Sequence, residues 1–185
     1  MPQSETQKQL ETALDEFQVG QAAMGDKAAF DLLYRRWHPR LYRLACRLTG
    51  HPDEARDVLQ EAALTIARDI HKLEDPAKFS AWAYTIIRRR AADHIAKAVR
   101  RRDVENHVSE TVSSSVPEDD LSLRQALTRL PETERLMLTL FYQDGFLGTE
   151  IAAALGIPLG TVKSRLFKAR AHLKSIYTST EGEVL

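Results

Sequence analysis

A stripe of basic and hydroxyl side chains near the C-terminus is the part of this sequence best suited to hold a polyanion. No acidic residue occurs between Gly160 and Thr180. At helical spacing, one side of this segment carries Lys163, Ser164, Phe167 and Lys168, with Arg165 and Arg170 beside them. Such side chains neutralise phosphates and donate hydrogen bonds to base edges, so the stripe indicates DNA binding. The alternative is an ordinary solvated helix face, on which Lys and Arg serve only solubility.

The residues around the stripe predict two helices joined by a tight turn. Gly145 can end the preceding helix in a left-handed conformation, and Gly156 with Ile157-Pro158 can form the corner. The residues that we expect these two helices to bury are Ile151, Ala152 and Leu155 in the first, and Val162, Leu166, Ala169 and Leu173 in the second. Such an arrangement is a helix-turn-helix, which places its second helix in the major groove of DNA.

The charges of the chain are segregated, although its 185 residues have a formal net charge of zero. Residues 26–102 contain seventeen basic and ten acidic residues, whereas residues 103–120 contain six acidic residues and no Lys or Arg. Basic blocks separated by an acidic stretch favour contact with a nucleic acid, with the acidic stretch steering or competing.

Two helices open the first basic block, after a short helix expected from Leu10 to Met24. From Phe30 to Gly50, apolar residues recur at helical spacing with five arginines between them, which predicts an amphipathic helix that could kink at Pro39. The next helix begins at Pro52. Its buried stripe is expected to contain Ala55, Val58, Leu59, Ala62, Ile66 and Ile70, which leaves Asp57, Gln60 and Glu61 exposed.

A third helix of this block combines aromatic residues with dense positive charge. Asp75 is a suitable N-cap for it, and Trp82 lies near its start. The polar residues that follow include Arg88, Arg89, Asp93, His94 and Lys97. Bases stack on aromatic rings and phosphates pair with arginines, so the segment suits single-stranded nucleic acid. A solvated surface explains the basic run equally well, and Trp82 could simply belong to the core.

A second helical domain follows the acidic stretch. Pro131 separates two helices, and we expect Leu136, Leu140 and Phe141 to point inward before the stop at Gly145. No useful period-2 pattern occurs, so the sequence predicts an all-α protein of two small helical domains joined by a flexible acidic linker. The expected divisions are a tail and short helix (1–25), a first domain (26–103), the linker (104–120), a second domain (121–177) and a tail (178–185).

Several function classes are disfavoured by composition. Cys46 is the only cysteine and lies on the apolar side of its helix, so we expect a small buried hydrophobe. The six histidines have no metal-ligand spacing, and Asp93-His94 lacks a partner nucleophile, so we expect no catalytic residue, metal or cofactor. The polar N-terminus and the lack of a long apolar run predict no membrane insertion and a cytoplasmic protein.

Motifs in both domains together resemble the extracytoplasmic-function (ECF) group of bacterial sigma factors, the dissociable specificity subunits of RNA polymerase. The resemblance covers the chain from about Phe30 to Ser175. In the first domain it rests on Phe30–Tyr34, Leu41–Ala45, Glu54–Glu61, Phe79–Trp82 and Ala92–Ile95. In the second domain it rests on Leu130–Glu132, Glu150–Ala152 and Gly156–Arg165.

The resemblance implies three binding surfaces. The surface for the clamp helices of the largest polymerase subunit would comprise Asp57, Leu59, Gln60 and Glu61. The surface that melts the minus-ten element would comprise Trp82, Arg88, Arg89, Asp93, His94 and Lys97. The surface that reads the minus-thirty-five element would comprise Thr161, Lys163, Ser164, Arg165, Phe167, Lys168 and Arg170, of which Arg165 and Arg170 would hold phosphates.

The resemblance also implies partners. These are promoter DNA, core RNA polymerase, including the flap of its second-largest subunit, and an anti-sigma factor that covers the polymerase-binding surfaces. The acidic linker would run toward the RNA exit path.

Three positions depart from the family pattern. Arg89 stands where Asn is usual and Ala96 where Arg is usual, so recognition of the melted element can differ from the common preference. Leu147 replaces the usual capping Ser, and Thr149 could cap one turn later.

Two other classes of function remain open. A free-standing regulator that binds DNA as a dimer would fit the second domain almost as well, but it needs neither a docking surface nor a melting helix. An enzyme fits least, because no catalytic constellation is evident.

Overall fold

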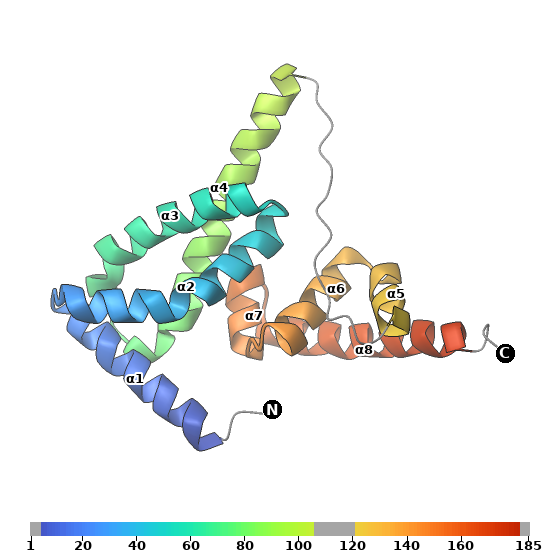
Figure 1. The fold of residues 1–185 in the computed structure, drawn as a ribbon, viewed down its shortest axis with the longest axis horizontal. Coiled ribbons are helices and arrows are strands. Elements are labelled where there is room, and N and C mark those ends of the chain that lie inside the picture. The colour runs from blue at the N-terminus through green and yellow to red at the C-terminus, as the bar shows by residue number, and fades with distance from the viewer. Residues whose placement is uncertain (1–4, 106–120, 182–185) are drawn as a thin grey trace. The chain divides into compact units, whose positions relative to one another are not determined.

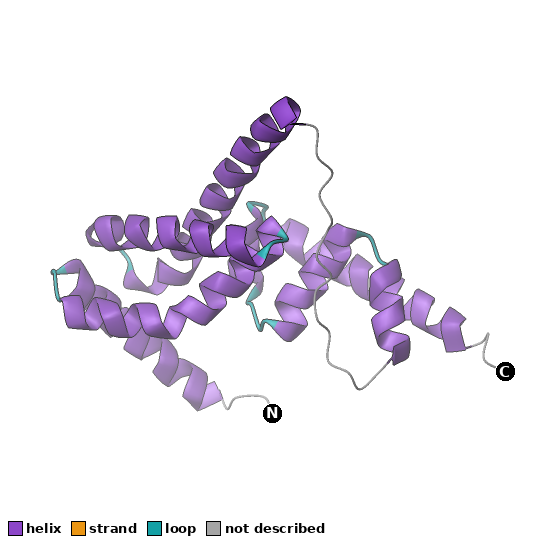
Figure 2. Ribbon diagram, turned by 45° about the horizontal axis from the view of Figure 1, so that its top comes forward, coloured by secondary structure: helices purple, strands orange, loops and turns teal. Residues whose placement is uncertain are grey.

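The computed structural model describes residues 5–105 and 121–181, and every regular element in these residues is helical (Figure 2). The chain divides into two compact units, Met1–Ser109 and Glu110–Leu185, each of which is described by itself (Figure 1). The predicted all-α fold with two helical domains is therefore confirmed.

Unit 1 consists of four long helices with two short 3₁₀ turns before the last. Its elements are α1 Glu5–Ala23, α2 Lys27–Thr49, α3 Pro52–Asp69, η1 Ile70–Lys72, η2 Pro76–Lys78 and α4 Phe79–Glu105. The elements of unit 2 are α5 Leu121–Arg129, α6 Glu132–Leu138, the π-helical turn η3 Thr139–Gln143, α7 Gly148–Leu155 and α8 Leu159–Glu181.

The boundaries of the predicted linker and tail differ partly from the helices. Residues 104 and 105 belong to α4, and the rest of the predicted acidic linker lies outside the described residues. Likewise, α8 extends to Glu181, beyond the predicted domain end at residue 177, and residues 182–185 lie outside the described part.

Local sequence signals fix both ends of α2. The Asp26 carboxylate accepts hydrogen bonds from the backbone N–H groups of Ala28 at 2.8 Å and Ala29 at 3.1 Å, so it satisfies two of the free donors at the helix start. At the other end Gly50 has φ of 75°, a left-handed conformation that glycine adopts without a Cβ clash. The helix continues through Pro39 as one element.

The first helix is longer than predicted, because it begins at Glu5 instead of Leu10. Val19 and Ala22 are buried, and polar groups add to this contact with α2. Arg36 forms an ion pair with Asp15 and donates to the Gln18 side chain at 2.7 Å, while the Trp37 indole N–H donates to Asp15 at 3.0 Å. These polar contacts join two different helices, so the apolar periodicity of the sequence does not predict them.

The core of unit 1 forms where α2, α3 and α4 meet. Its fully buried side chains include Leu33, Leu41, Leu44, Val58, Ile66, Tyr84 and Ile87. Trp37 packs edge-on against Phe79, with ring centroids 5.3 Å apart, and against Tyr84 at 5.8 Å. The predicted buried stripe of α3 is confirmed at all six positions. Cys46 differs from its prediction, because it is only half-buried.

The π-helical turn η3 changes which side chains enter the core of unit 2. The backbone N–H of Asp144 donates to the carbonyl of Thr139, five residues earlier, at 3.0 Å. This wider turn breaks the 3.6-residue periodicity on which the prediction for Phe141 relied, and that prediction is wrong: Phe141 is exposed. Leu136 is half-buried, whereas Leu140 and Phe146 fill the core. Gly145 has φ of 69°, as predicted.

Removing the N-cap of α2 should destabilise unit 1. For Asp26→Ala we expect a loss of about 0.5–2 kcal/mol in the free energy of unfolding, because two backbone donors lose their acceptor. Both tryptophans of the chain, Trp37 and Trp82, lie in unit 1, so urea unfolding followed by their fluorescence measures this unit. Asp31→Ala, at an exposed position inside α2, is the control. Equal stability of the two variants would contradict the capping role.

Candidate functional site

The turn between α7 and α8 positions the predicted DNA-binding helix. Gly156 has φ of 69°, and its backbone N–H donates to the Ala152 carbonyl, so it closes α7 in the left-handed conformation. The N–H of Ile157 donates to the same carbonyl at 3.1 Å, and Val162 donates to the Pro158 carbonyl at 3.1 Å as α8 starts. The helix-turn-helix geometry that the sequence predicts is therefore present in unit 2.

The packing between the two helices differs from the prediction at three positions, which are half-buried instead of buried. Val162, Leu166 and Ala169 of α8 are buried as expected, while Leu173 is half-buried. On α7, Ile151 and Ala154 are fully buried, whereas Ala152 and Leu155 are only half-buried. The prediction for Ala152 and Leu155 is therefore wrong, because α7 turns the face with Ile151 and Ala154 into the core.

The start of α7 retains half of a capping box. Leu147 occupies the N-cap position, and its hydrocarbon side chain cannot accept a hydrogen bond. The buried Glu150 carboxylate accepts from the Leu147 backbone N–H at 2.8 Å, which supplies the reciprocal half. Thr149 lies inside the first turn, so the suggestion that it caps a later helix start is wrong.

The outer face of α8 is open to a ligand. The exposed side chains are Lys163, Ser164, Arg165, Phe167, Lys168 and Arg170, while Thr161 is half-buried. Phe167 is 70% exposed, which is unusual for a phenylalanine and leaves its ring available for apolar contact. The Ser164 hydroxyl donates to the Thr161 carbonyl at 3.1 Å, and Arg170 Nε donates to the Leu166 carbonyl at 3.2 Å. We name Lys163, Ser164, Phe167 and Lys168 the reading face.

A second candidate surface lies on α3. Asp57, Gln60 and Glu61 are exposed, as predicted, and we name them the docking face. Leu59 lies between them in the sequence but is only 4% exposed, so it contributes to the core and to the wall of an adjacent groove. The docking face therefore offers two carboxylates and an amide to a partner.

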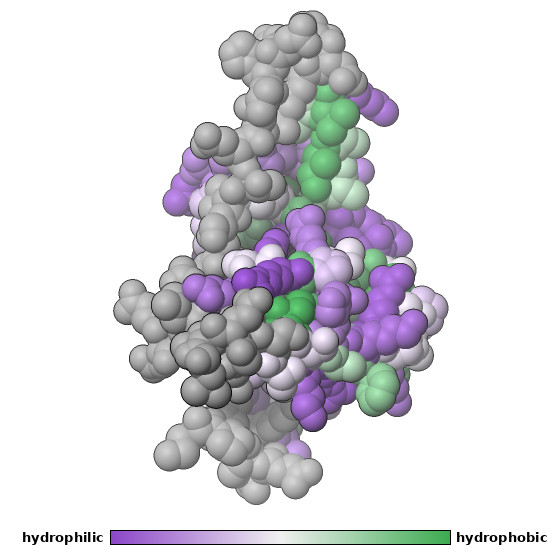
Figure 3. Space-filling model, turned by 90° about the vertical axis from the view of Figure 1, so that its right-hand side faces the viewer, coloured by the Kyte–Doolittle hydropathy of each residue, from purple (hydrophilic) through white to green (hydrophobic). Residues whose placement is uncertain are grey.

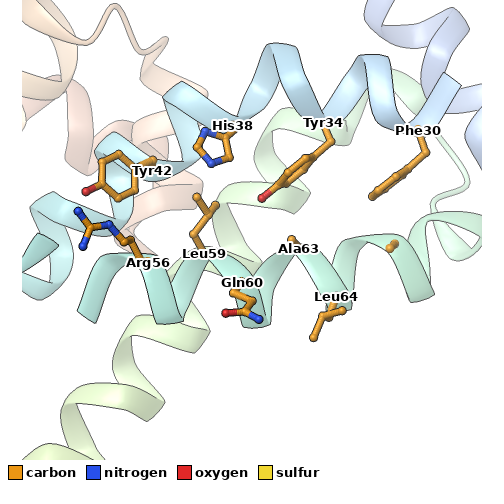
Figure 4. A pocket seen from close by; sticks show the side chains of 10 residues that line it. Phe30, Tyr34, His38, Tyr42, Arg56, Leu59, Gln60, Ala63 and Leu64 are labelled. Atoms are coloured by element: carbon orange, nitrogen blue, oxygen red, sulfur yellow. The ribbon is translucent and has the colours of Figure 1, made fainter. Parts of the chain in front are cut away.

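A groove between α2 and α3 adjoins the docking face (Figure 4). Its volume is about 650 Å³, and Phe30, Tyr34, His38 and Tyr42 line its α2 side as an aromatic ladder. Neighbouring rings of the ladder are 5.5 to 6.3 Å apart. The α3 side is lined by Arg56, Leu59, Gln60, Ala63, Leu64 and Ala67. Sequence reasoning missed this groove, although aromatic residues at successive i, i+4 positions were a usable signal.

Local contacts change the acidity of two ladder hydroxyls. Burial raises the pKa of Tyr34, because the phenolate would lose solvation. The pKa of Tyr42 is raised mainly by a hydrogen bond with the Cys46 side chain, and burial adds to the increase. Both tyrosines therefore remain neutral donors at physiological pH.

In the structure, some side chains of the predicted single-strand surface on α4 are exposed and others are half-buried. Arg89, Asp93 and Lys97 are exposed, and Trp82 is half-buried with its ring 6.1 Å from that of Phe79. Arg88 is half-buried, and its Nε has no hydrogen-bond partner in the described part of the chain. His94 is half-buried, and its Nδ1 lies 3.7 Å from the Glu54 carboxylate of α3.

Beyond these contacts, α4 carries an exposed apolar strip beside its polar side chains. Ile95 is 39% and Val99 is 49% exposed, and Figure 3 shows green, hydrophobic surface toward its top. Polar, charged and apolar groups are thus available together on this helix, which suits bases and phosphates of an unpaired strand.

Neither a metal-ligand cluster nor a membrane-spanning helix occurs within the described residues. No group of three or more His, Cys, Asp or Glu side chains in residues 5–105 and 121–181 could hold a metal ion. None of the described helices is long and apolar enough to cross a membrane.

Comparisons with known proteins match both units to one family. The family model for sigma-70 region 2 matches residues 33–101, and the model for sigma-70 region 4 matches residues 120–173. The chain is 36% identical over 152 residues to the ECF RNA polymerase sigma factor SigM of Mycobacterium tuberculosis, which covers 80% of this chain and 77% of that protein. It is 33% identical over 177 residues to the ECF RNA polymerase sigma-E factor of Escherichia coli, covering 86% and 92%.

Solved structures have the same fold. The sigma factor RpoE of Bartonella quintana, in complex with the anti-sigma factor NepR, superimposes with a TM-score of 0.62 at 25% identity and covers 80% of this chain and 96% of that one. CnrH, in complex with the cytosolic domain of CnrY, gives a TM-score of 0.60 at 23% identity and covers 90% and 98%.

Glycine should be required at the turn before α8. For Gly156→Ala we expect unit 2 to lose roughly 1–2 kcal/mol of stability, because a Cβ disfavours the left-handed conformation. The measurement is native-state hydrogen exchange of the α7 and α8 amides. Gly160→Ala is the matched control, since Gly160 is helical and an added Cβ would meet nothing within 4 Å. Equal exchange rates in both variants would refute the requirement.

Proposed function

The chain belongs to the extracytoplasmic-function group of RNA polymerase sigma factors, within the sigma-70 family, and from this premise we propose how its two units divide the work. It is an alternative sigma factor that directs transcription initiation with core RNA polymerase. Sigma factors are regulatory initiation factors and not catalysts, so we assign this chain no catalytic step. As a polymerase subunit, it would act in the cytoplasm.

Unit 1 docks on core polymerase through its docking face. Asp57 and Glu61 would pair with cationic side chains of the clamp helices, and Gln60 would add a neutral donor and acceptor. The exposure of all three residues on one side of α3 supports this assignment. Leu59 would support the surface from below, because it is buried. Unit 2 would contact the flap of the second-largest subunit.

The α4 helix of unit 1 melts the minus-ten element and holds its non-template strand. Arg89, Asp93 and Lys97 are the exposed polar groups on this helix, so they would contact bases and phosphates directly. Trp82 is half-buried and could stack on a base only with part of its ring. Arg88 and His94 would act mainly by shaping the helix surface, because both are half-buried.

Unit 2 reads the minus-thirty-five element as duplex DNA. The observation that carries this proposal is the basic outer face of α8 on a helix-turn-helix, with Val162, Leu166 and Ala169 buried behind it. The reading face would contact base edges, and the Phe167 ring suits a thymine methyl group. Thr161, Arg165 and Arg170 would position the helix on phosphates.

An anti-sigma factor would control access to these surfaces. The solved relative RpoE is in complex with the anti-sigma factor NepR, which supports a similar partner for this chain. Such a partner would hold the sigma factor inactive by covering the groups that bind polymerase.

Changing the docking face should weaken polymerase binding without unfolding unit 1. For Asp57→Lys combined with Gln60→Ala, we expect affinity for core polymerase to fall about tenfold or more, because charge reversal replaces attraction by repulsion. The measurement is a titration of core polymerase with labelled protein. Asp31→Lys, an equal charge change at an exposed position on α2, is the control. An unchanged affinity would reject this docking face.

Changing the reading face should alter promoter choice. Core polymerase with the wild-type protein should start transcription on genomic DNA fragments downstream of two elements at one fixed spacing. For Lys163→Ala or Lys168→Ala we expect weaker transcription and relaxed preference at one position of the upstream element, a change of about 1–3 kcal/mol in discrimination. Lys174→Ala, at an exposed position farther along α8, controls for loss of charge.

The outcomes of this assay separate the possible roles. If the substitution of Lys163 or Lys168 reduced transcription equally from every promoter variant, we would assign that lysine to a phosphate contact instead of a base contact. No new transcription start, together with tight sequence-specific binding of duplex DNA by the protein alone, would favour a free-standing regulator.

A further inference from the structure

Three consecutive arginines of α4 lie in different surroundings. Arg89 is exposed, Arg88 is half-buried, and Arg90 reaches across to α3. Nη2 of Arg90 donates to the Thr65 hydroxyl at 2.9 Å, and its Nη1 lies 3.9 Å from the Glu61 carboxylate. An arginine on the DNA-melting helix is thus in contact with a residue of the docking face.

Thr65 holds the Arg90 guanidinium in a defined place. The Thr65 hydroxyl donates its one hydrogen to the backbone carbonyl of Glu61 at 3.0 Å. Only its lone pairs then remain for Arg90, so the hydroxyl is fixed as an acceptor. The guanidinium is anchored at one nitrogen by Thr65 and presents the other to Glu61, which uses its planar fork geometry.

A second pair of acidic and basic side chains, Glu54 and His94, lies in the same contact between α3 and α4. His94 lies four residues after Arg90, and its Nδ1 is 3.7 Å from the Glu54 carboxylate, seven residues before Glu61. The polar stripe of α4 formed by Arg90 and His94 therefore follows the acidic edge of α3. Because Arg90 lies on this stripe, its side chain faces α3, whereas the Arg89 side chain faces solvent.

We propose that Arg90 is a positioning residue of the docking face, although it belongs to the DNA-melting helix by sequence. It holds the Glu61 carboxylate in one orientation, so that polymerase meets a preordered acid. The inference rests on the proposed docking through Asp57, Gln60 and Glu61. A free glutamate would lose rotamer entropy on binding, and prior ordering removes part of that cost.

The exposure of the pair argues that its effect lies in orientation and not in folding. The Arg90 side chain is 33% and the Glu61 side chain 48% exposed, and ion pairs at such positions add little to stability. Direct binding of DNA phosphate by Arg90 is less consistent with the geometry, because its guanidinium is engaged by Thr65 and Glu61.

A double-mutant cycle on polymerase affinity tests the proposal with the full-length protein. The variants are Glu61→Gln, Arg90→Met and both together, titrated against core polymerase. We expect Arg90→Met to weaken binding about two- to fivefold, the range that partly exposed ion pairs give. In the Glu61→Gln background, Arg90→Met should have no further effect, because the group that it positions is already absent.

Thr65→Val provides an independent arm that leaves both charges in place. Valine has nearly the shape of threonine but no acceptor for Arg90, so binding should weaken in the same direction, and Thr65→Ser should restore it. Arg68→Met is the matched control, since Arg68 is an exposed, ion-paired arginine elsewhere on α3 and should leave affinity unchanged. Urea unfolding followed by tryptophan fluorescence checks that each variant folds.

Two results would overturn the inference, and they differ. Weakening by Glu61→Gln with no effect of Arg90→Met, or with additive effects in the double variant, would leave docking intact but remove the positioning role. An unchanged affinity for Glu61→Gln would reject Glu61 as a docking residue and the positioning role with it.

Discussion

The burial of one side of α2 is the interaction on which unit 1 depends. Trp37 sits where α2 meets α4, in edge-on contact with Phe79 and Tyr84, and Leu33, Leu41 and Leu44 extend the same buried face. Burying large apolar and aromatic side chains is the main driving force available to so small a unit. Because α3 and α4 both pack on this face, their opposite sides are left in solvent with fixed orientations, and these sides carry the docking face and the residues proposed to melt the minus-ten element.

In unit 2, the turn between α7 and α8 determines which side of α8 is buried. Gly156 ends α7 in the left-handed conformation from which the chain turns into α8, and the small side chains of Ala154 and Ala169 are fully buried. Once that side of α8 is buried, Lys163, Phe167 and Lys168 must face outward. The reading face is therefore a consequence of helix packing, and its chemistry follows from which residue types occupy the remaining positions.

Charge acts locally in this chain, although the sum is zero. Exposed charges are screened over about 8 Å in physiological salt, so each exposed charge acts mainly on its immediate surroundings. Within unit 1, acidic and basic side chains meet at the contact between α3 and α4, where Arg90 and His94 face Glu61 and Glu54. This contact joins the surface assigned to polymerase with the helix assigned to DNA.

The sequence alone determined the helical class, the two-unit organisation, the buried stripe of α3 and the basic outer face of α8, because 3.6-residue periodicity, glycine and proline are local signals. Tertiary structure decided the rest. The π-helical turn put Phe141 outside, contacts between α1 and α2 paired Asp15 with Arg36 and Trp37, and the crossing of α3 and α4 turned Arg90 toward Glu61. These outcomes depend on residues far apart in the chain, and periodicity shows which side of a helix is apolar but not which partner that side meets.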